Sequence, residues 1–161
     1  MTTKIKAFVL SISDTRTSDN DVSGDELAGL LSSFGADLVG KQIISDDLED
    51  IRNTLHALTE REDVNLVVTT GGTGFAQRDN TPEATRGVID REAPGIAEAM
   101  RRETAMKTPM AMLSRGIAGI RNQTLIINLP GSPKAVRECF EVIRPALMHA
   151  VLLMGGRADH S

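Results

Sequence analysis

The sequence contains no tryptophan and no tyrosine, and its only aromatic residues are four phenylalanines. A core with so few rings has to be built from Leu, Ile, Val, Met and Ala. No stretch is long and apolar enough to span a bilayer, and the N-terminus lacks the pattern of a secretory signal peptide. These absences predict a protein without a membrane partner.

Cysteine is almost absent as well, since Cys139 is the only one. A single cysteine cannot form an intramolecular disulfide, which suits a reducing compartment and predicts a cytoplasmic location. Cys139 falls on an expected helix, so its position favours a packed thiol over a nucleophile.

Excess positive charge is also lacking, because 18 basic residues face 22 acidic ones and the net charge is −4. This balance argues against general nucleic-acid binding, which depends on neutralising many phosphates. It leaves room for a small anion in a local pocket. A length of 161 residues suits one compact domain, and we expect residues 1–161 to form it.

Strand and helix patterns alternate along the chain. Strands are expected at residues 5–12, 36–44, 64–70, 117–120 and 124–128, and helices at 23–34, 48–58, from 81, from 94 toward 107, and at 132–154. The order is largely βαβαβ. It predicts an α/β fold in which helices cover both faces of a mostly parallel sheet.

Several helix boundaries carry local signals. Ser23 and Glu26 have the spacing of a capping box, and Thr81 and Ser132 each precede a proline in the way of an N-cap residue. Pro145 lies inside the last helical pattern, where we expect it to produce a kink.

The glycine-rich stretch Thr69-Thr70-Gly71-Gly72-Thr73-Gly74 follows the apolar run 64–68 directly. Glycines let a backbone approach a ligand closely, and exposed backbone N–H groups can cradle an anion. Gln77 occupies the place where the dinucleotide-binding pattern needs a third glycine, and no P-loop motif is present. The stretch predicts a pocket for a phosphorylated small molecule, although a simple tight turn would also explain it.

Polar residues follow the other expected strands: Ser13-Asp14, Ser45-Asp46-Asp47 and Pro130 to Lys134. In a parallel sheet such connections gather at one edge, so these residues are expected to meet. Ser132 and Lys134 could form an anion site at a helix start or merely begin a helix.

Two aspartates have competing interpretations. Asp79, between the glycine stretch and Thr81, is either a ligand of magnesium or substrate or a simple turn residue. Asp46 is either a helix cap or a group that takes part in chemistry. Arg78, Arg115 and Arg121 could bind phosphate or lie solvated on the surface. His56, His149 and His160 have no ligand spacing, which disfavours a zinc site.

Five motifs, taken together in this order, resemble the MoaB/MogA family of molybdenum cofactor biosynthesis, which includes the G domains of proteins such as gephyrin. They are Ser11-Ile12-Ser13-Asp14, Thr69-Thr70-Gly71-Gly72-Thr73-Gly74, Arg78-Asp79-x-Thr81-Pro82-Glu83-Ala84, Leu113-Ser114-Arg115 and Asn128-Leu129-Pro130-Gly131-Ser132-Pro133-Lys134. The resemblance covers about residues 4–154. The segment 143–149 is closer to the MoaB branch.

The resemblance implies a three-layer α/β/α sandwich with Rossmann-like topology, assembled as a homotrimer or a hexamer. It implies binding of molybdopterin and its adenylylation with Mg-ATP, which releases pyrophosphate. By the same resemblance, Asp46 and Asp79 match the family's two important aspartates and are the expected catalytic residues. We further expect both to hold Mg²⁺ against the ATP phosphates. The substrate-binding residues would be Ser13, Asp14, Thr70, Gly71, Gly72, Thr73, Gly74, Ser114, Arg115, Pro130, Gly131, Ser132 and Lys134.

Two other functions stay open at this point. Some members of the MoaB branch bind the pterin without transferring adenylate, and the gephyrin domain drives assembly. The presence of both Asp46 and Asp79 favours the enzyme.

Overall fold

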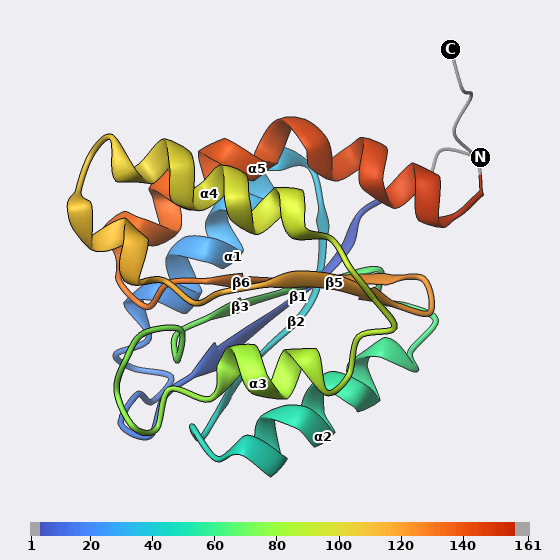
Figure 1. Cartoon of the computed structure of the whole chain (residues 1–161). Coiled ribbons are helices and arrows are strands. Elements are labelled where there is room, and N and C mark those ends of the chain that lie inside the picture. The colour runs from blue at the N-terminus through green and yellow to red at the C-terminus, as the bar shows by residue number, and fades with distance from the viewer. Residues whose placement is uncertain (1–3, 157–161) are drawn as a thin grey trace.

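A computed structural model describes residues 4–156 and places their strands in one six-stranded sheet (Figure 1). The strand order is β2-β1-β3-β6-β5-β4. The strands are β1 (Lys6–Ile12), β2 (Asp37–Ile44), β3 (Leu66–Thr70), β4 (Arg91–Glu92), β5 (Ala118–Arg121) and β6 (Thr124–Leu129). The first three and β6 are parallel, and β5 and β4 continue the sheet with antiparallel pairing. The mostly parallel sheet is therefore confirmed.

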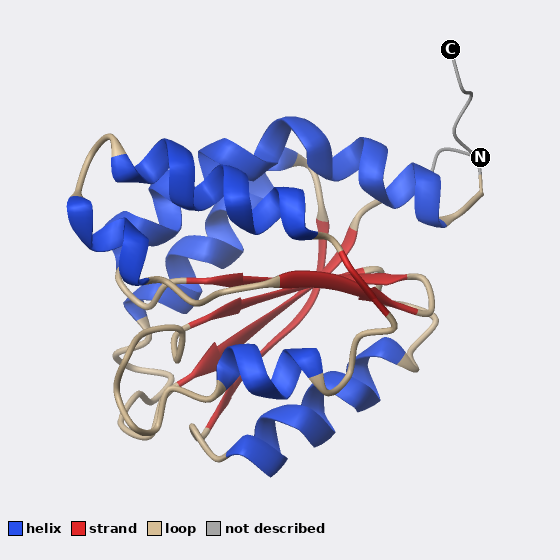
Figure 2. Ribbon diagram, viewed as in Figure 1, coloured by secondary structure: helices blue, strands red, loops and turns tan. Residues whose placement is uncertain are grey.

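Helices cover both faces of this sheet (Figure 2). The helices are α1 (Val22–Phe34), α2 (Leu48–Thr59), α3 (Thr81–Arg86), α4 (Pro94–Ala105), the 3₁₀ helix η1 (Pro109–Leu113) and α5 (Pro133–Met154). Helices α1, α4 and α5 lie on one face, and α2 and α3 lie on the other. The expected three-layer sandwich is confirmed. Within residues 4–156, no helix has both the length and the apolar character needed to cross a bilayer.

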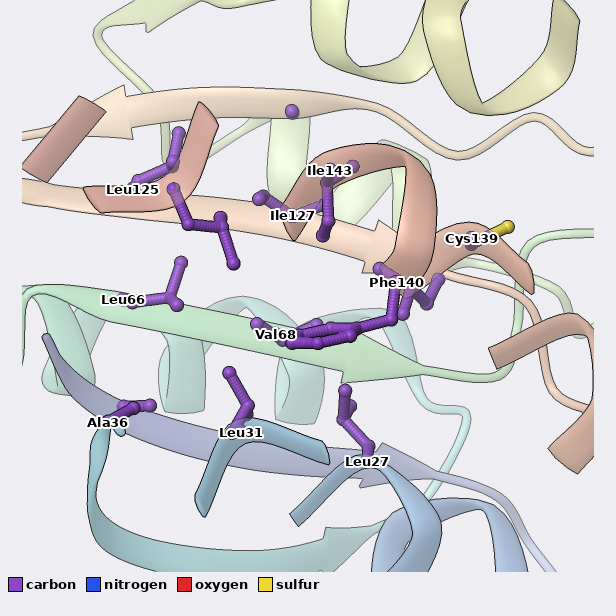
Figure 3. Packing of buried hydrophobic residues seen from close by; sticks show 14 of the residues in the cluster. Leu27, Leu31, Ala36, Leu66, Val68, Leu125, Ile127, Cys139, Phe140 and Ile143 are labelled. Carbon is purple, nitrogen blue, oxygen red and sulfur yellow. The ribbon is translucent and has the colours of Figure 1, made fainter. Parts of the chain in front are cut away.

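Each face of the sheet buries its own aliphatic core. All five residues of β3 are buried, as expected for a central parallel strand covered on both sides. Under α1 and α5, Leu27 and Leu31 pack with Val68 and Ile127 (Figure 3). Phe140 meets Phe34 edge to face, with ring centroids 6.2 Å apart. Burying each such side chain contributes roughly 2 kcal/mol.

Two of the three predicted helix starts are wrong by one or two residues. Helix α1 is capped by Asp21, which accepts a hydrogen bond from Gly24 N at 3.1 Å, so Ser23 is not its cap. Helix α3 has Asn80 at the N-cap position. The hydroxyls of Ser23 and Thr81 instead donate hydrogen bonds to Gly131 O and Gly71 O, which lie in other loops. These two side chains therefore do not cap their own helices.

The last helix begins where the sequence predicts. The hydroxyl of Ser132 accepts a hydrogen bond from Ala135 N at 3.1 Å, which confirms the cap. Helix α5 continues through Pro145 as far as Met154. Pro145 is exposed, so its ring faces away from the sheet side of the helix.

The connections that follow the parallel strands converge at one edge of the sheet. Strand β1 lies between β2 and β3, so the chain leaves β1 toward one face and β3 toward the other. Ser13 N donates to Ile44 O at 2.9 Å, and Gly71 N donates to Leu129 O at 3.2 Å. This is the topological switch point at which open α/β sheets bind ligands.

A buried charge ties the first of these connections down. Asp21 is fully buried and accepts hydrogen bonds from Ser11 Oγ at 2.6 Å and from Lys41 Nζ at 2.8 Å. Burial alone would raise the pKa of Asp21, but the hydrogen bonds from Lys41, Ser11 and Gly24 outweigh it and lower the pKa. Arg16, from the same loop, donates to Gly131 O at 2.6 Å and thereby joins this loop to the start of α5.

We predict that Asp21→Ala destabilises the protein by about 3 kcal/mol, because Lys41 loses its fully buried carboxylate partner, and Ser11 Oγ and Gly24 N lose their hydrogen-bond acceptor. Asp25→Ala is the matched control. Asp25 also contacts Lys41, at 3.0 Å, but its side chain is 67% exposed, so its loss should cost less than about 1 kcal/mol. Urea unfolding at pH 7 measures both values, and equal losses would contradict the assignment.

Candidate functional site

The glycine loop, residues 71–74, requires glycine at its first two positions. Gly71 has a φ of +105° and Gly72 a φ of +68°, which side chains rarely allow. A Cβ on Gly71 would lie 2.4 Å from Ile12 O, and one on Gly72 would lie 2.3 Å from Thr81 Oγ1. Both the conformation and the close packing therefore exclude larger residues.

Neighbouring elements hold the loop in place. Thr70 Oγ1 donates to Pro130 O at 2.7 Å, and Thr81 donates from Oγ1 to Gly71 O and from N to Gly72 O. The loop's own N–H groups are used differently. Among residues 4–156, the N–H groups of Gly72, Thr73 and Gly74 have no hydrogen-bond acceptor in the chain. Such a run of unused backbone donors suits an anion.

A cavity of about 460 Å³ opens beside this loop, bounded by α4, η1 and the first turns of α5. Eight residues of the predicted site line it: Gly72, Thr73, Gly74, Asp79, Ser114, Pro130, Gly131 and Ser132. The opposite wall is largely apolar and includes Ala97, Met100, Ala111 and Leu113. The cavity therefore has a polar end at the glycine loop and a mainly apolar remainder, whose wall also includes Arg101, Thr104 and Glu138.

Asp79 lies on the cavity side of the loop. Its Oδ2 accepts a hydrogen bond from Ala76 N at 3.0 Å, and a Cβ on Gly74 would lie 2.9 Å from the same oxygen. The backbone thus comes close to the carboxylate because residue 74 is glycine.

Arg115 fastens the glycine loop from outside. Its Nε donates to Gly74 O and its Nη2 to Asp79 O, both at 2.7 Å, and its Nη1 pairs with Glu83 at the same distance. Its backbone N donates to Thr73 O at 2.8 Å. All three guanidinium nitrogens of Arg115 are engaged with the chain, and Arg115 does not line the cavity, so its expected role in binding substrate stays a prediction.

A second polar cluster lies on the other flank of the glycine loop. Asp46 Oδ2 accepts a hydrogen bond from Asp14 N at 2.9 Å, and Asp14 Oδ1 accepts one from Asp46 N at 3.1 Å. Arg78 donates to both carboxylate oxygens of Asp14, at 2.7 and 3.0 Å, and these bonds lower the pKa of Asp14 to about 2. A Cβ on Gly72 would lie 3.3 Å from Asp46 Oδ1.

Asp46 does not cap α2. Asp47 does so, because its side chain accepts a hydrogen bond from Asp50 N at 3.1 Å while the carboxylate of Asp46 faces Asp14. The expectation that Asp46 caps the helix is thus wrong. Burial raises the pKa of Asp46, and the negative charges of Asp14 and Asp79 raise it further. A cation close to this cluster would relieve that repulsion.

No metal cage is built from protein side chains alone. In the part of the chain that the structure describes, no three His, Cys, Asp or Glu residues are grouped so as to hold a metal ion. A metal here would need ligands from a substrate as well, which is the usual arrangement for Mg²⁺ bound to phosphates. His160 lies outside the described residues.

The remaining predicted site residues lie around the cavity without lining it. These are Ser13, Asp14, Asp46, Thr70, Gly71, Arg115 and Lys134. The side chain of Lys134 is 79% exposed. Cys139 is buried, as expected, and burial raises the pKa of its thiol to about 11, yet it contributes to the cavity wall. The apolar wall from α4 and η1 carries no sequence signal that distinguishes it from ordinary core.

The chain is similar to known proteins in both sequence and fold. Residues 8–149 match the family described as "Probable molybdopterin binding domain". The chain belongs to this family. A molybdopterin adenylyltransferase of Helicobacter pylori is 43% identical over 152 residues, which cover 92% of this chain and 86% of that protein. The molybdenum cofactor synthesis protein cinnamon of Drosophila melanogaster is 45% identical over 91% of this chain, which corresponds to 25% of the longer fly protein.

Solved structures of the family share the fold. The molybdopterin biosynthesis enzyme MoaB of Thermus thermophilus superposes with a TM-score of 0.87 at 42% identity, covering 94% of this chain and 97% of that one. A molybdenum cofactor biosynthesis protein B has a TM-score of 0.91 at 34% identity, with 97% and 99% coverage.

We predict that Asp46→Asn increases stability at pH 7, whereas Asp47→Ala decreases it by about 1 kcal/mol through loss of the α2 cap. The raised pKa of Asp46 means that the folded state binds its proton more tightly than the unfolded state does. Stability is therefore lost as the pH rises through this pKa, and asparagine avoids the loss. Urea unfolding at pH 7 and pH 3 measures the effect, and the gain from Asp46→Asn should vanish at pH 3. A decrease at pH 7 comparable to that of Asp47→Ala would contradict the assignment.

Proposed function

We propose that this chain is a molybdopterin adenylyltransferase, which transfers AMP from ATP to the terminal phosphate of molybdopterin and releases pyrophosphate. Relatives with this name in Helicobacter pylori and Haemophilus influenzae are 43% and 40% identical over most of the chain, which supports the proposal. The observation that carries it is the arrangement of the N–H groups of Gly72 to Gly74, which have no acceptor among the described residues, beside Asp79 at the polar end of a mainly apolar cavity.

The reaction brings two anions together, so charge neutralisation and alignment supply most of the catalysis. The backbone donors of the glycine loop and the start of α5 at Ser132 would hold phosphate groups. Lys134, exposed two residues further on, would add a positive charge that can move toward them. The terminal phosphate of molybdopterin is ionised at neutral pH, so its attack needs no general base.

Asp79 and Asp46 flank the glycine loop and are the residues that would hold Mg²⁺ together with ATP. The fit rests on the donor set, because carboxylate oxygens suit this hard cation, and the negative charges of Asp14 and Asp79 add to burial in raising the pKa of Asp46. When bound, the ion would offset the charge of the ATP phosphates. Asp14, held by Arg78, would orient Asp46 through their reciprocal backbone contacts.

Asp79→Asn should reduce the rate of pyrophosphate release by roughly 100-fold or more while leaving pterin affinity nearly unchanged. Asparagine keeps a side-chain oxygen for Ala76 N but loses the charge that would hold the metal ion. The assay incubates purified protein with molybdopterin, ATP and magnesium, and pterin binding is measured separately by equilibrium titration.

Asp63→Asn is the control for this substitution. Asp63 is exposed, pairs with Arg61 and precedes β3 at the edge of the sheet opposite the glycine loop. The Asp63→Asn variant should therefore release pyrophosphate at the rate of the wild type. Tight pterin binding by the wild type without pyrophosphate release would favour a non-catalytic carrier. Normal turnover of Asp79→Asn at saturating substrate would contradict the role given to Asp79.

We also propose a homotrimer in the cytoplasm, the compartment that supplies ATP. Four exposed apolar side chains around η1 (Met106, Met110, Met112 and Leu113) support an interface with another copy of the chain. Sedimentation equilibrium should give about three times the chain mass of 17.3 kDa, or six times for a hexamer. A mass equal to one chain at micromolar concentration would contradict assembly.

A further inference from the structure

Glu138 is a largely buried carboxylate that the proposed transfer step does not use. It lies on α5, and its side chain is only 15% exposed although it forms part of the cavity wall. Among residues 4–156, no hydrogen-bond donor contacts its oxygens, and its nearest cation, Lys134 Nζ, is 4.0 Å away and mostly in solvent. A charge removed from water in this way is costly unless a partner compensates it.

The surroundings of Glu138 explain why its partner has to come from a ligand. Of the other lining residues on α4 and α5, Ala97, Met100, Ala135 and Cys139 offer no strong donor, and Thr104 donates its hydroxyl to Met100 O. Arg101 also lines the cavity, but its Nη1 donates to the carbonyls of Ser114 and Gly116 and anchors the segment that follows η1. Glu138 therefore presents an acceptor-only group to the cavity interior.

The two ring systems of the proposed reaction differ in what they offer to such a group. A pterin carries a ring N–H next to its 2-amino group, so two parallel donors face one edge and match the two oxygens of a carboxylate. Adenine places ring-nitrogen acceptors beside its amino group on both sides, so one oxygen of a carboxylate would face another acceptor. The cavity carboxylate thus discriminates between the rings.

We propose that Glu138 is the specificity residue for the pterin ring and that its carboxylate accepts hydrogen bonds from the 2-amino group and the adjacent ring N–H. The identity of the ligand rests on the proposed function. The arrangement places the pterin in the cavity between α4 and α5, with its phosphate toward the glycine loop. Adenine then occupies the other flank of that loop, beside Asp46 and Asp14.

The test uses two fluorescent probes, 6-hydroxymethylpterin and 6-hydroxymethyllumazine, in which an oxo group replaces the 2-amino group. The protein has no Trp or Tyr, so the background is low. The wild type should bind the pterin at least about tenfold more tightly than the lumazine, because the lumazine turns an acceptor toward Glu138. Glu138→Gln should weaken pterin binding by about tenfold and abolish the preference. In steady-state assays it should raise the KM for molybdopterin and leave the KM for ATP unchanged.

Glu141→Gln is the matched control, because Glu141 lies on the same helix with its side chain 61% exposed and should bind both probes like the wild type. Unchanged thermal midpoints exclude a folding defect. Equal affinity of wild type and Glu138→Gln for the pterin, or failure of the wild type to prefer it, overturns the inference. If Glu138→Gln loses the preference for the pterin while the wild type releases no pyrophosphate, the inference is upheld and the proposed transfer activity is rejected.

Discussion

The site depends on the close approach of the Gly71–Gly72 backbone to the end of β1 and to the start of α3. A single methyl group at either position would overlap Ile12 O or Thr81 Oγ1. The carbonyls of the loop accept hydrogen bonds from Thr81 and Arg115, whereas the N–H groups of Gly72, Thr73 and Gly74 have no acceptor among the residues that the structure describes. The same contact brings the connections after β1, β2, β3 and β6 to one edge of the sheet.

The glycine loop also divides the site into two flanks of different character. On one flank, Asp79 faces a cavity with apolar walls, and Arg115 fixes both Gly74 and Asp79 through their carbonyls. On the other flank, Asp46 is held by Asp14, which Arg78 holds in turn. Burial raises the pKa of Asp46 on this flank, and the negative charges of Asp14 and Asp79 raise it further. Perturbed pKa values of this kind are typical of sites that bind a ligand.

The sequence predicted the sheet and the convergence of its loops because both follow from short-range patterns. Apolar strands followed by polar residues specify a parallel sheet edge, and Ser132-Pro133 specifies a helix start that no distant group disturbs. The caps of α1 and α3 were mispredicted because the hydroxyls of Ser23 and Thr81 donate to carbonyls of other loops, which lie 108 and 10 residues away along the chain, respectively. The roles of Arg115 and Glu138 depend on which elements face them across the fold, and local patterns do not contain that information.

The central claim is that the N–H groups of Gly72, Thr73 and Gly74 bind a phosphate group of the substrate. Amide NMR spectra of the ¹⁵N-labelled protein, recorded during titration with molybdopterin, test it most directly. If these N–H groups bind the phosphate, their three amide protons should shift downfield, and the shifts should saturate together with pterin binding. Saturating binding that leaves all three signals in place would contradict it.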